Sequence, residues 1–249
     1  MIDFHSHVLA NIDDGAKNLE TSIKMLEESK RQGVKTVVCT PHYYSQRRSP
    51  EQFLQKRAAI ASSLLSHVPE GIELRLGAEV YFTTDTITAF DELALLCIEG
   101  TRYIMLELPF TAKYDEKLFK KIEEFITETD CIPLIAHVDR YPAVYRKPAI
   151  LTRLAAMGCL FQVNAEAFFV KGVQNLVLAM LKKGMVHAVG TDMHNMENRA
   201  PNIQAFAKLL DEMPTEVQER LRKTETDILE NRRVEPTGQT VKKVFGKFF

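Results

Sequence analysis

An α/β barrel is the fold class that this sequence predicts. Apolar, strand-sized segments recur seven times along the 249 residues, and amphipathic segments with helical spacing lie between most of them. This alternation is typical of parallel strands that are joined by crossover helices. Seven such units indicate a barrel with one unit fewer than the usual eight. We expect a single domain over residues 1–249, of which 231–249 form a C-terminal tail.

The expected strands are short and apolar, and they cover residues 1–7, 34–40, 72–79, 102–108, 132–137, 160–164 and 186–192. The expected helices lie between and after them, at about 20–32, from about 50, and at about 115–129, 148–157, 174–183, 201–211 and 215–230. The first helix is indicated by Leu19, Ile23 and Leu26 at helical spacing, with Gly33 as its C-terminal cap. The second is indicated by the sequence Ser-Pro-Glu-Gln at 49–52, which combines an N-cap, a first-turn proline and a capping-box partner.

The tail loses helical periodicity after Asn231, contains Pro236 and Gly238, and ends in KKVFGKFF. Its basic and aromatic residues could contact an acidic membrane surface or a neighbouring subunit. A plain surface extension is the interpretation we favour.

The composition excludes several classes of function. Thirty-two basic against 33 acidic residues leave a net charge of −1, which argues against a nucleic-acid partner. The apolar runs are far shorter than the ~20 residues that a transmembrane helix needs. The N-terminal MIDFHSH lacks the basic start and apolar stretch of a signal peptide, so we expect a cytoplasmic protein.

The four cysteines predict inert packing rather than chemistry. They lack a C-x-x-C pair, and most lie in apolar runs.

Two histidines at the end of the first strand predict a metal site. His5 and His7 project from the same face of a strand, about 7 Å apart, because strand side chains alternate. A short loop with Asp13 and Asp14 follows. A single histidine is more often an ordinary polar residue, but this pair before two carboxylates favours a metal.

Every later strand but one ends in a similar group: His42, Glu79, Glu107, His137, and Asp192 with His194. In a parallel barrel all strand C-termini open on one face, so these side chains are expected to meet there. Burying Glu107 unpaired among apolar neighbours would be costly, which favours a functional role. His67 near a helix end and His187 at the opposite end of its strand are excluded from the site.

Imidazole and carboxylate ligands without thiolate suit Mn²⁺, Fe²⁺ or Zn²⁺ better than a structural zinc site. The candidates exceed what one ion binds, so we expect two or three ions that share a carboxylate and a water. Such a cluster lowers the pKa of the shared water and holds the attacking and leaving oxygens of a displacement. Arg140 and Arg199 follow His137 and His194 closely. A guanidinium beside cations needs an anion, and phosphate matches its planar fork.

The motifs that carry these residues resemble a known family. MIDFHSH, IDDGAK, TPHYY, GAEVY, LELP, AHVDRY and TDMHN occur in this order over nearly the whole chain. They are similar to the polymerase and histidinol phosphatase (PHP) superfamily, and within it to the CpsB/CapC/YwqE-like manganese-dependent protein-tyrosine phosphatases of bacterial capsule and exopolysaccharide operons. The final KKVFGKFF is also similar to the ends of such proteins.

The resemblance implies a distorted seven-stranded (β/α)7 barrel of the PHP type with three metal positions. Mn²⁺ is the expected ion, and Fe²⁺, Co²⁺ or Zn²⁺ are alternatives. The first ion would be held by His5, His7, Glu79 and Asp192. The second would share Glu79 and be completed by Glu107 and His137. The third would be held by Asp14, His42 and His194, and the phosphoryl group by Arg140 and Arg199.

Two residue assignments stay open when the family's motifs are matched to this sequence. Asp13 is adjacent to Asp14, and sequence alone does not choose which carboxylate points inward. Family members often have glutamate before the matching arginine, where this chain has Asp139. That change could loosen the grip on Arg140 but should leave the metals unaffected.

The resemblance also implies an activity. It is hydrolysis of phosphotyrosine, by attack of a metal-bridging hydroxide, on the tail of a cytoplasmic tyrosine autokinase that controls capsular or exopolysaccharide synthesis. One alternative is a small-molecule phosphatase of the histidinol phosphatase kind, against which the DDGAK loop and the FGKFF tail argue. The other is a non-catalytic, metal-binding regulator of the kinase, which the full ligand set disfavours.

Overall fold

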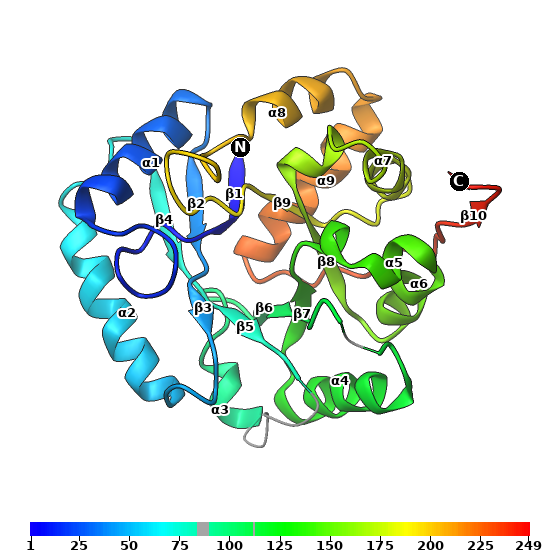
Figure 1. The fold of residues 1–249 in the computed structure, drawn as a ribbon, viewed down its shortest axis with the longest axis horizontal. Helices are drawn as coiled ribbons and strands as arrows, with labels where there is room; N and C mark the ends of the chain where they lie inside the picture. The colour runs from blue at the N-terminus through cyan, green and yellow to red at the C-terminus, as the bar shows by residue number, and fades with distance from the viewer. Residues whose placement is uncertain (84–89, 112) are drawn as a thin grey trace.

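The computed structural model describes residues 1–83, 90–111 and 113–249, with parallel strands at the centre and helices around them (Figure 1). The strands are β1 Ile2–Ser6, β2 Thr36–Cys39, β3 His42–Tyr43, β4 Glu73–Leu76, β5 Glu79–Tyr81, β6 Tyr103–Glu107, β7 Ile132–Ile135, β8 Leu160–Asn164, β9 Ala188–Gly190, β10 Lys243–Val244 and β11 Lys247–Phe248. The α-helices are α1 Leu19–Arg31, α2 Pro50–Leu65, α3 Phe90–Ala94, α4 Glu116–Thr129, α5 Pro142–Arg146, α6 Ala149–Ala156, α7 Gln174–Lys182, α8 Gln204–Asp211 and α9 Thr215–Leu229. Two short 3₁₀ helices, η1 Val138–Arg140 and η2 Ala165–Phe168, follow β7 and β8.

The parallel strands form two sheets. One has the order β1-β2-β4, and the other is a curled sheet of six strands in the order β3-β5-β6-β7-β8-β9. Every pairing within these two sheets is parallel, as the βα alternation predicts. The fold is therefore a mixed α/β structure with a curled parallel sheet.

One of the expected strands is interrupted, and here the prediction of a continuous strand at 72–79 was wrong: Gly77 and Ala78 separate β4 from β5. The strand expected at 34–40 contains β2, and a further short strand, β3, follows it after Thr40 and Pro41. Pro41 has no backbone N–H to donate to a ladder, which explains why β2 and β3 are separate. The second halves, β3 and β5, belong to the six-stranded sheet.

Backbone hydrogen bonds join β1 to the chain that follows β9. The Asp192 amide donates to the His5 carbonyl at 2.8 Å, and the His7 amide donates to the Met193 carbonyl at 2.9 Å. The first strand thus lies beside the end of the last parallel strand, and β1 and β9 are neighbours in Figure 1.

The helices begin and end close to the expected residues where local signals are strong. In α2, Ser49 accepts from the Gln52 amide, and the Gln52 side chain accepts from the Ser49 amide, which confirms the capping box. The Asn18 side chain caps α1, whose buried face includes Met25 and Leu26. The helix expected at 201–211 begins only at Gln204, and α3 and α5 were not expected.

Apolar side chains pack in two clusters. The larger lies between strands and helices and includes Met25, Phe125 and Phe206. The smaller combines side chains from both parallel sheets, and its members are Phe4, Val38, Ile98, Tyr103, Met105, Leu134, Ala136, Leu160, Ala188 and Ile228. The sheets therefore share an interior as well as a helix-covered outside.

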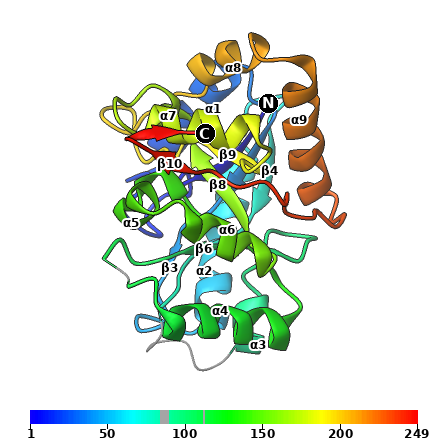
Figure 2. The same ribbon diagram turned by 90° about the vertical axis from the view of Figure 1, so that its right-hand side faces the viewer.

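The tail is more ordered than a plain extension requires. Its end forms an antiparallel hairpin, β10 and β11, which lies beside α5 and α7 (Figure 2). Phe248 packs against Tyr145 of α5 with ring centroids 5.3 Å apart, and Val241 is buried. No helix within the described residues is long and apolar enough to cross a membrane.

Candidate metal centre

The side chains of β1 build one side of the candidate site. His5 and His7 project from the same face of the strand, and their Nε2 atoms lie 3.1 Å apart. Both rings are completely buried. Two ring nitrogens at this distance, aimed at one another, need a proton or a cation between them, since two lone pairs would repel.

Glu79 at the start of β5 lies at the centre of the site. Its Oε1 is 2.8 Å from Nε2 of His137, and its Oε2 is 3.3 Å from Nε2 of His5 and 3.4 Å from Nε2 of His7. Oε2 is also 2.9 Å from Nδ1 of His42. One buried carboxylate thus faces four imidazoles, which is the arrangement that a carboxylate shared between two cations requires.

The described residues form three groups whose potential ligand atoms lie within 4.8 Å of one another. Their members are His5, His7 and Asp192; His42, Glu79 and Glu107; and His7, Asp14, His42 and His194. His137 joins the second group through Nε2, which lies 3.5 Å from Oε1 of Glu107. All nine residues expected as ligands are therefore brought together, and the groups overlap through His7 and His42.

The loop after β1 distinguishes the two adjacent aspartates. Asp13 accepts from Nδ1 of His7 at 2.7 Å and from the backbone amide of His42 at 2.9 Å, so it orients a histidine. Asp14 instead places Oδ1 3.5 Å from Nε2 of His42 and 3.6 Å from Nε2 of His194. Asp14 is the one that points into the cluster, while Asp13 holds the tautomer of His7.

Gln162 on β8 orients His5, and the sequence-based reasoning missed it. The backbone amide of His137 donates to Oε1 of Gln162 at 2.6 Å, and a backbone N–H can only donate, so this atom is the oxygen. Nδ1 of His5 lies 3.0 Å from the same oxygen and must therefore carry the proton. The lone pair of His5 is left on Nε2, which faces the cluster.

The tautomer of His194 is fixed in the same way as that of His5. Its Nδ1 lies 2.9 Å from the backbone carbonyl oxygen of Asp192 and donates to it. Its buried Nε2 has no hydrogen-bond partner among the described residues, and neither has Nδ1 of His137. Oε2 of Glu79 and Nδ1 of His42 lie 2.9 Å apart without hydrogen-bond geometry, so these two atoms are unsatisfied as well. Buried polar atoms normally have hydrogen-bond partners, so these unsatisfied nitrogen and oxygen atoms are suited to bind divalent cations.

The carboxylates and imidazoles of the cluster stabilise one another electrostatically. Burial alone would raise the pKa of Glu79, but the imidazoles of His5 and His137 hold it well below its usual range. Burial likewise opposes the low pKa of Asp192, which His5 and His7 impose. The ionised forms of Glu79 and Asp192 are thus favoured because imidazoles face them.

Glu107 differs from the other carboxylates. Burial and the neighbouring charge of Glu79 raise its pKa, against the opposing effect of His137. A carboxyl group in this position gains most from a cation that offsets the charge of Glu79, in agreement with a ligand role.

Two ligand residues have left-handed backbones, with φ of 29° at His137 and 54° at Asp192. Such conformations are uncommon for non-glycine residues and gather at functional sites. Glycine is required nearby, because a Cβ at Gly190 would lie 2.4 Å from Cβ of His5 and one at Gly15 only 2.2 Å from the His7 carbonyl oxygen. Close backbone approach therefore places the β1 histidines.

The two arginines meet on the outer oxygen of Asp192. Nη1 of Arg140 is 3.0 Å and Nη2 of Arg199 is 2.6 Å from Oδ2, while Oδ1 faces Nε2 of His7 at 3.4 Å. Both guanidinium groups are about half-buried, with side-chain exposures of 43% and 35%. They can therefore reach an anion that binds at the mouth of the cluster.

Asp139 forms no ion pair with Arg140 among the described residues. Its Oδ1 accepts from the backbone amide of Asn164 at 2.9 Å, and burial raises its pKa to about 6. The Asn164 side chain in turn lies 3.4 Å from Oδ2 of Asp192. Asp139 thus joins η1 to the end of β8.

The residues that we excluded lie outside the cluster. His67 is exposed just after α2. His187 is buried, accepts from the Phe161 amide through Nδ1 at 3.0 Å, and has its pKa lowered to about 3 by burial. All four cysteines are free, and three are buried.

Aromatic side chains next to the cluster were also missed. Phe110 stacks on His137 with centroids 5.6 Å apart, and Cζ of Arg140 lies 5.1 Å from its centroid. Tyr44 lies 5.5 Å from the ring of His42. The LELPF and PHYY motifs place Phe110 three residues after Glu107 and Tyr44 two residues after His42, and this closeness in sequence was the available signal.

Fold and site together define an α/β protein whose parallel strands gather imidazoles and carboxylates into one buried cluster of potential metal ligands. The family model described as "Capsular polysaccharide synthesis, CpsB/CapC" matches residues 1–228. The chain belongs to the CpsB/CapC family, which confirms the resemblance drawn from its motifs.

Curated relatives cover most of the chain. The tyrosine-protein phosphatase CpsB of Streptococcus pneumoniae is 30% identical over 213 residues, which are 82% of this chain and 87% of the relative. The tyrosine-protein phosphatase YwqE of Bacillus subtilis strain 168 is 30% identical over 214 residues, 80% of this chain and 79% of the relative.

Solved structures agree. One solved structure comes from work described as crystal structures of YwqE from Bacillus subtilis and CpsB from Streptococcus pneumoniae, "unique metal-dependent tyrosine phosphatases". It superposes on this chain with a TM-score of 0.81 at 25% sequence identity. The superposition covers 98% of this chain and all of the solved chain. The Escherichia coli phosphotriesterase homology protein has a TM-score of 0.56 at 13% identity, covers 91% of this chain and 97% of its own, and shares the fold alone.

Proposed function

We propose that this chain is a metal-dependent protein-tyrosine phosphatase, a phosphoric monoester hydrolase. The observation that carries the proposal is the position of Asp192, whose Oδ1 faces the buried imidazoles while its Oδ2 receives Arg140 and Arg199. Cation ligands and phosphate-binding guanidinium groups thus share one side chain. The names of the relatives, which are tyrosine-protein phosphatases, support the same activity.

The ligands would hold two or three divalent cations, Mn²⁺ first among them. We assign the cation ligands to His5, His7, Asp14, His42, Glu79, Glu107, His137, Asp192 and His194. When bound, such cations activate a water for attack on phosphorus and offset charge on the transferring group. The mixed nitrogen and oxygen donor set suits Mn²⁺, Fe²⁺, Co²⁺ or Zn²⁺.

The protein's own groups would position the phosphoryl group. Arg140 and Arg199 offer planar donor forks to its equatorial oxygens, whose charge grows as the bond to the leaving oxygen breaks. Asn164 and the arginines hold Oδ2 of Asp192, so Oδ1 keeps its direction toward the imidazoles. No side chain needs to form a covalent intermediate, since attack in line with the leaving group is sufficient.

Phe110 supports an aryl phosphate as substrate. Its side chain is 39% exposed and lies between His137 and Arg140 at the edge of the cluster. An aromatic ring in this position can stack on the ring of a phosphotyrosine whose phosphate reaches the arginines. We propose that the substrate is the phosphorylated tyrosine tail of a bacterial tyrosine kinase that controls capsular or exopolysaccharide synthesis.

We further propose that the parallel strands form one distorted (β/α)7 barrel, within a single domain over 1–249. In this barrel β2 and β3 together count as one of the seven strands, and β4 and β5 together count as another. The backbone bonds between β1 and residues 192–193 support closure, as does the apolar cluster drawn from both sheets. Four free cysteines support a location in the reducing cytoplasm.

The test is phosphate release by the full chain from three substrates: a phosphotyrosine peptide, the same peptide with phosphoserine, and histidinol phosphate. Each is measured with Mn²⁺ added and after chelation. We expect rapid, metal-dependent release from phosphotyrosine alone. Preference for histidinol phosphate would make the chain a small-molecule phosphatase, and phosphopeptide binding without release would make it a regulator.

The aryl preference is tested with Phe110→Ala. Loss of ring stacking should raise KM for the phosphotyrosine peptide about fivefold, with little change for phosphoserine, because stacking is worth about 1 kcal/mol. Phe169→Ala, which removes another half-exposed phenylalanine, is the matched control. Equal effects of Phe110→Ala on both peptides would contradict the stacking role.

A further inference from the structure

The C-terminal hairpin presents two different faces. Lys243 pairs with Phe248, and this pair faces the protein: Nζ of Lys243 lies 3.9 Å from the ring centroid of Tyr145 and donates to its carbonyl at 3.1 Å. Because side chains alternate along a strand, the next pair, Val244 with Lys247, points outward. The outer face therefore mixes apolar and basic residues.

The tip of the hairpin exposes an aromatic ring completely. Phe245 has an exposure of 102%, and Val244 and Phe249 are 47% and 59% exposed. Water contact with this much apolar surface is unfavourable, and three such residues in one short hairpin form a patch.

The backbone at the tip adds a second cost. Phe245 has φ of 47° and Gly246 has φ of 78°, so both loop residues are left-handed. Asparagine, aspartate or glycine suits this turn, whereas a bulky side chain at positive φ is strained. Phenylalanine thus occupies a position where neither exposure nor backbone conformation favours it, which indicates a role in binding.

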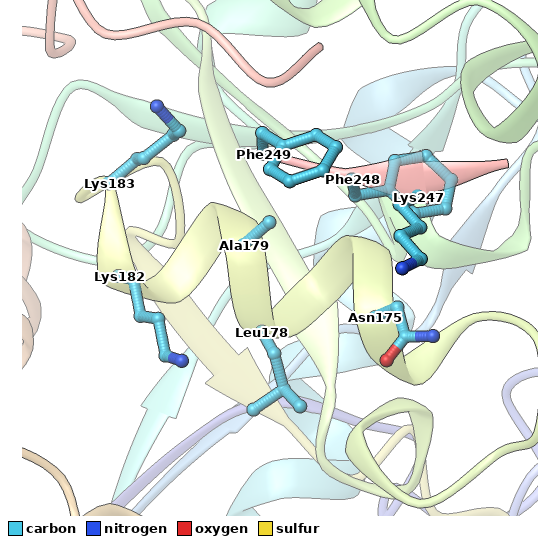
Figure 3. A pocket seen from close by; sticks show the side chains of 8 residues that line it. All are labelled: Asn175, Leu178, Ala179, Lys182, Lys183, Lys247, Phe248 and Phe249. Atoms are coloured by element: carbon cyan, nitrogen blue, oxygen red, sulfur yellow. The ribbon is translucent and has the colours of Figure 1, made fainter. Parts of the chain in front are cut away.

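Between the hairpin and α7 lies a groove of about 440 Å³. Figure 3 shows Leu178, Ala179 and the rings of Phe248 and Phe249 with lysines around them. The basic side chains at its rim are Lys182, Lys183 and Lys247. Among the described residues, no carboxylate forms an ion pair with these lysines or with Lys242, so their charge is available to a ligand.

The surrounding sequence is strongly biased in charge. Residues 140–191, which include α5, α6 and α7, contain seven lysines and arginines but a single acidic residue, Glu166. Residues 236–249 add three lysines and no acidic side chain. The rest of the chain has 22 basic and 32 acidic residues. The near-zero net charge conceals a positive region and a negative remainder.

We propose that the hairpin surface, defined by Lys182, Lys183, Lys242, Val244, Phe245, Lys247 and Phe249, docks the protein on an anionic phospholipid membrane. The tip phenylalanine enters the interface between headgroups and acyl chains, and the lysines contact lipid phosphates. Exposed aromatic residues among unpaired lysines are the combination that such an interface binds.

A second copy of the chain fits this surface less well. A symmetric dimer contact would place the hairpin surface against itself, so lysines would face lysines. An anionic bilayer has the opposite charge everywhere and also accepts apolar side chains. The hairpin is attached to α5, which begins two residues after Arg140, so docking would hold the candidate metal centre near the bilayer.

The test uses the full chain and sedimentation with vesicles. One set contains phosphatidylcholine alone, and the other contains about one-third phosphatidylglycerol, a composition that attracts lysines through its surface potential. We expect binding to the anionic vesicles only, weakening as salt is raised. Binding to neither set would overturn the proposal.

Two variants locate the contact. Phe245→Asn removes the ring but supplies a residue that suits the left-handed turn, so weaker binding cannot be attributed to a damaged hairpin. Lys242→Glu with Lys247→Glu reverses the charge. Each should weaken vesicle binding about tenfold, with hydrolysis of p-nitrophenyl phosphate unchanged.

Matched controls lie on other elements. Leu65→Gln removes an apolar side chain that is 62% exposed on α2, and Lys120→Glu with Lys208→Glu makes the same change of charge on α4 and α8. Both controls should bind like the parent. If the controls lost as much vesicle binding as the hairpin variants, the binding would depend only on the overall charge of the protein, and the proposal would be overturned. So would variants that lose self-association or phosphopeptide affinity while keeping vesicle binding.

Discussion

Both ends of the parallel strands bury ionisable side chains, but they do so in opposite ways. At the carboxyl ends, His5, Glu79 and Asp192 are buried together, and each lies within 3.5 Å of another. Near the starts of β1 and β9, His187 and Glu225 are buried with few charged neighbours. Burial lowers the pKa of His187 to about 3 and raises that of Glu225 to about 8, so both are neutral near pH 7.

The difference shows what marks a functional site. A buried titratable residue can simply lose its charge, and then it contributes to the core like any other polar side chain. At the carboxyl ends of the strands the charges are retained because opposite charges face one another. Several buried nitrogen and oxygen atoms there also lack hydrogen-bond partners among the described residues. Clustering and unsatisfied atoms, rather than burial, distinguish the candidate metal centre.

The largest expected effect comes from replacing His5 and His7 together with alanine. The cluster loses two nitrogen ligands, so bound metal should be lost and hydrolysis of p-nitrophenyl phosphate should fall by about 10³-fold or more, at least ~4 kcal/mol. Metal content by mass spectrometry and rates in excess Mn²⁺ measure this. His67→Ala is the control, and a double variant that is active after chelation would refute the metal centre.

Glu225→Gln tests the opposite end of the strands. The folded-state pKa of about 8 lies above the ordinary 4.5, so the folded protein holds a proton that the unfolded chain releases. Stability should therefore fall as pH rises from about 4.5 to about 8, and glutamine, which cannot ionise, should remove this loss. The variant should gain ~3 kcal/mol relative to the parent near pH 7.

Urea unfolding of both proteins at pH 5 and pH 8, with chelator present, measures the change. The groups near Glu225 are the N-terminal amine, Asp3 and Arg222, and the Val189 amide donates to its carboxyl group. A glutamine oxygen can accept the same bond. An unchanged difference between parent and variant at the two pH values would show that Glu225 is ionised in the folded state.

Arg199→Ala should reduce kcat/KM for a phosphotyrosine peptide about 10²-fold, or ~2.7 kcal/mol, since one donor to the transition-state oxygens is lost. Metal content should be retained, which separates this effect from that of the histidines. Arg199→Lys should recover little because a single ammonium group cannot replace the planar fork. Arg153→Ala, a half-exposed arginine on α6, is the control; equal losses would argue against phosphate binding by Arg199.

The smallest effect is expected from Gln162→Leu. The His5 ring would lose the acceptor that keeps its proton on Nδ1, so Mn²⁺ affinity should fall about tenfold, with activity restored by excess metal. Titration of the chelated protein with Mn²⁺ followed by activity measures this. If excess metal restores nothing, Gln162 has a structural role in the buried network instead.

Periodicity and local chemistry predicted much of the fold. The alternation of strands and helices, the capping box of α2 and the span 160–164 of β8 are all present in the structure. The break at Gly77 and the short strand β3 after Pro41 were not predicted. The segment 72–79 resembles one continuous strand, and its division depends on which sheet supplies the neighbouring strands. The short helices α3 and α5 give too few turns for a periodic signal.

Most candidate ligands were accessible to sequence reasoning because they end or follow apolar segments that were expected to be strands, and parallel strands bring their ends together. The choice between Asp13 and Asp14 was not accessible, since side-chain direction in an irregular loop follows no period. Gln162 was missed for a related reason: β8 is the one strand without a charged or imidazole end, and its contribution is a neutral amide within the strand.

The hydrogen bonds between β1 and the chain after β9 have a consequence for how the protein matures. They belong to a contact region that includes the bond from Thr191 to Asp3, which spans 188 positions of the sequence. Pairings of such separation form late, because closing a long loop costs entropy before any contact is gained. A chain still emerging from the ribosome thus presents His5 and His7 long before Asp192 and His194 exist. We therefore expect cation binding to coincide with completion of the fold, and unfinished chains to be inactive toward phosphoesters.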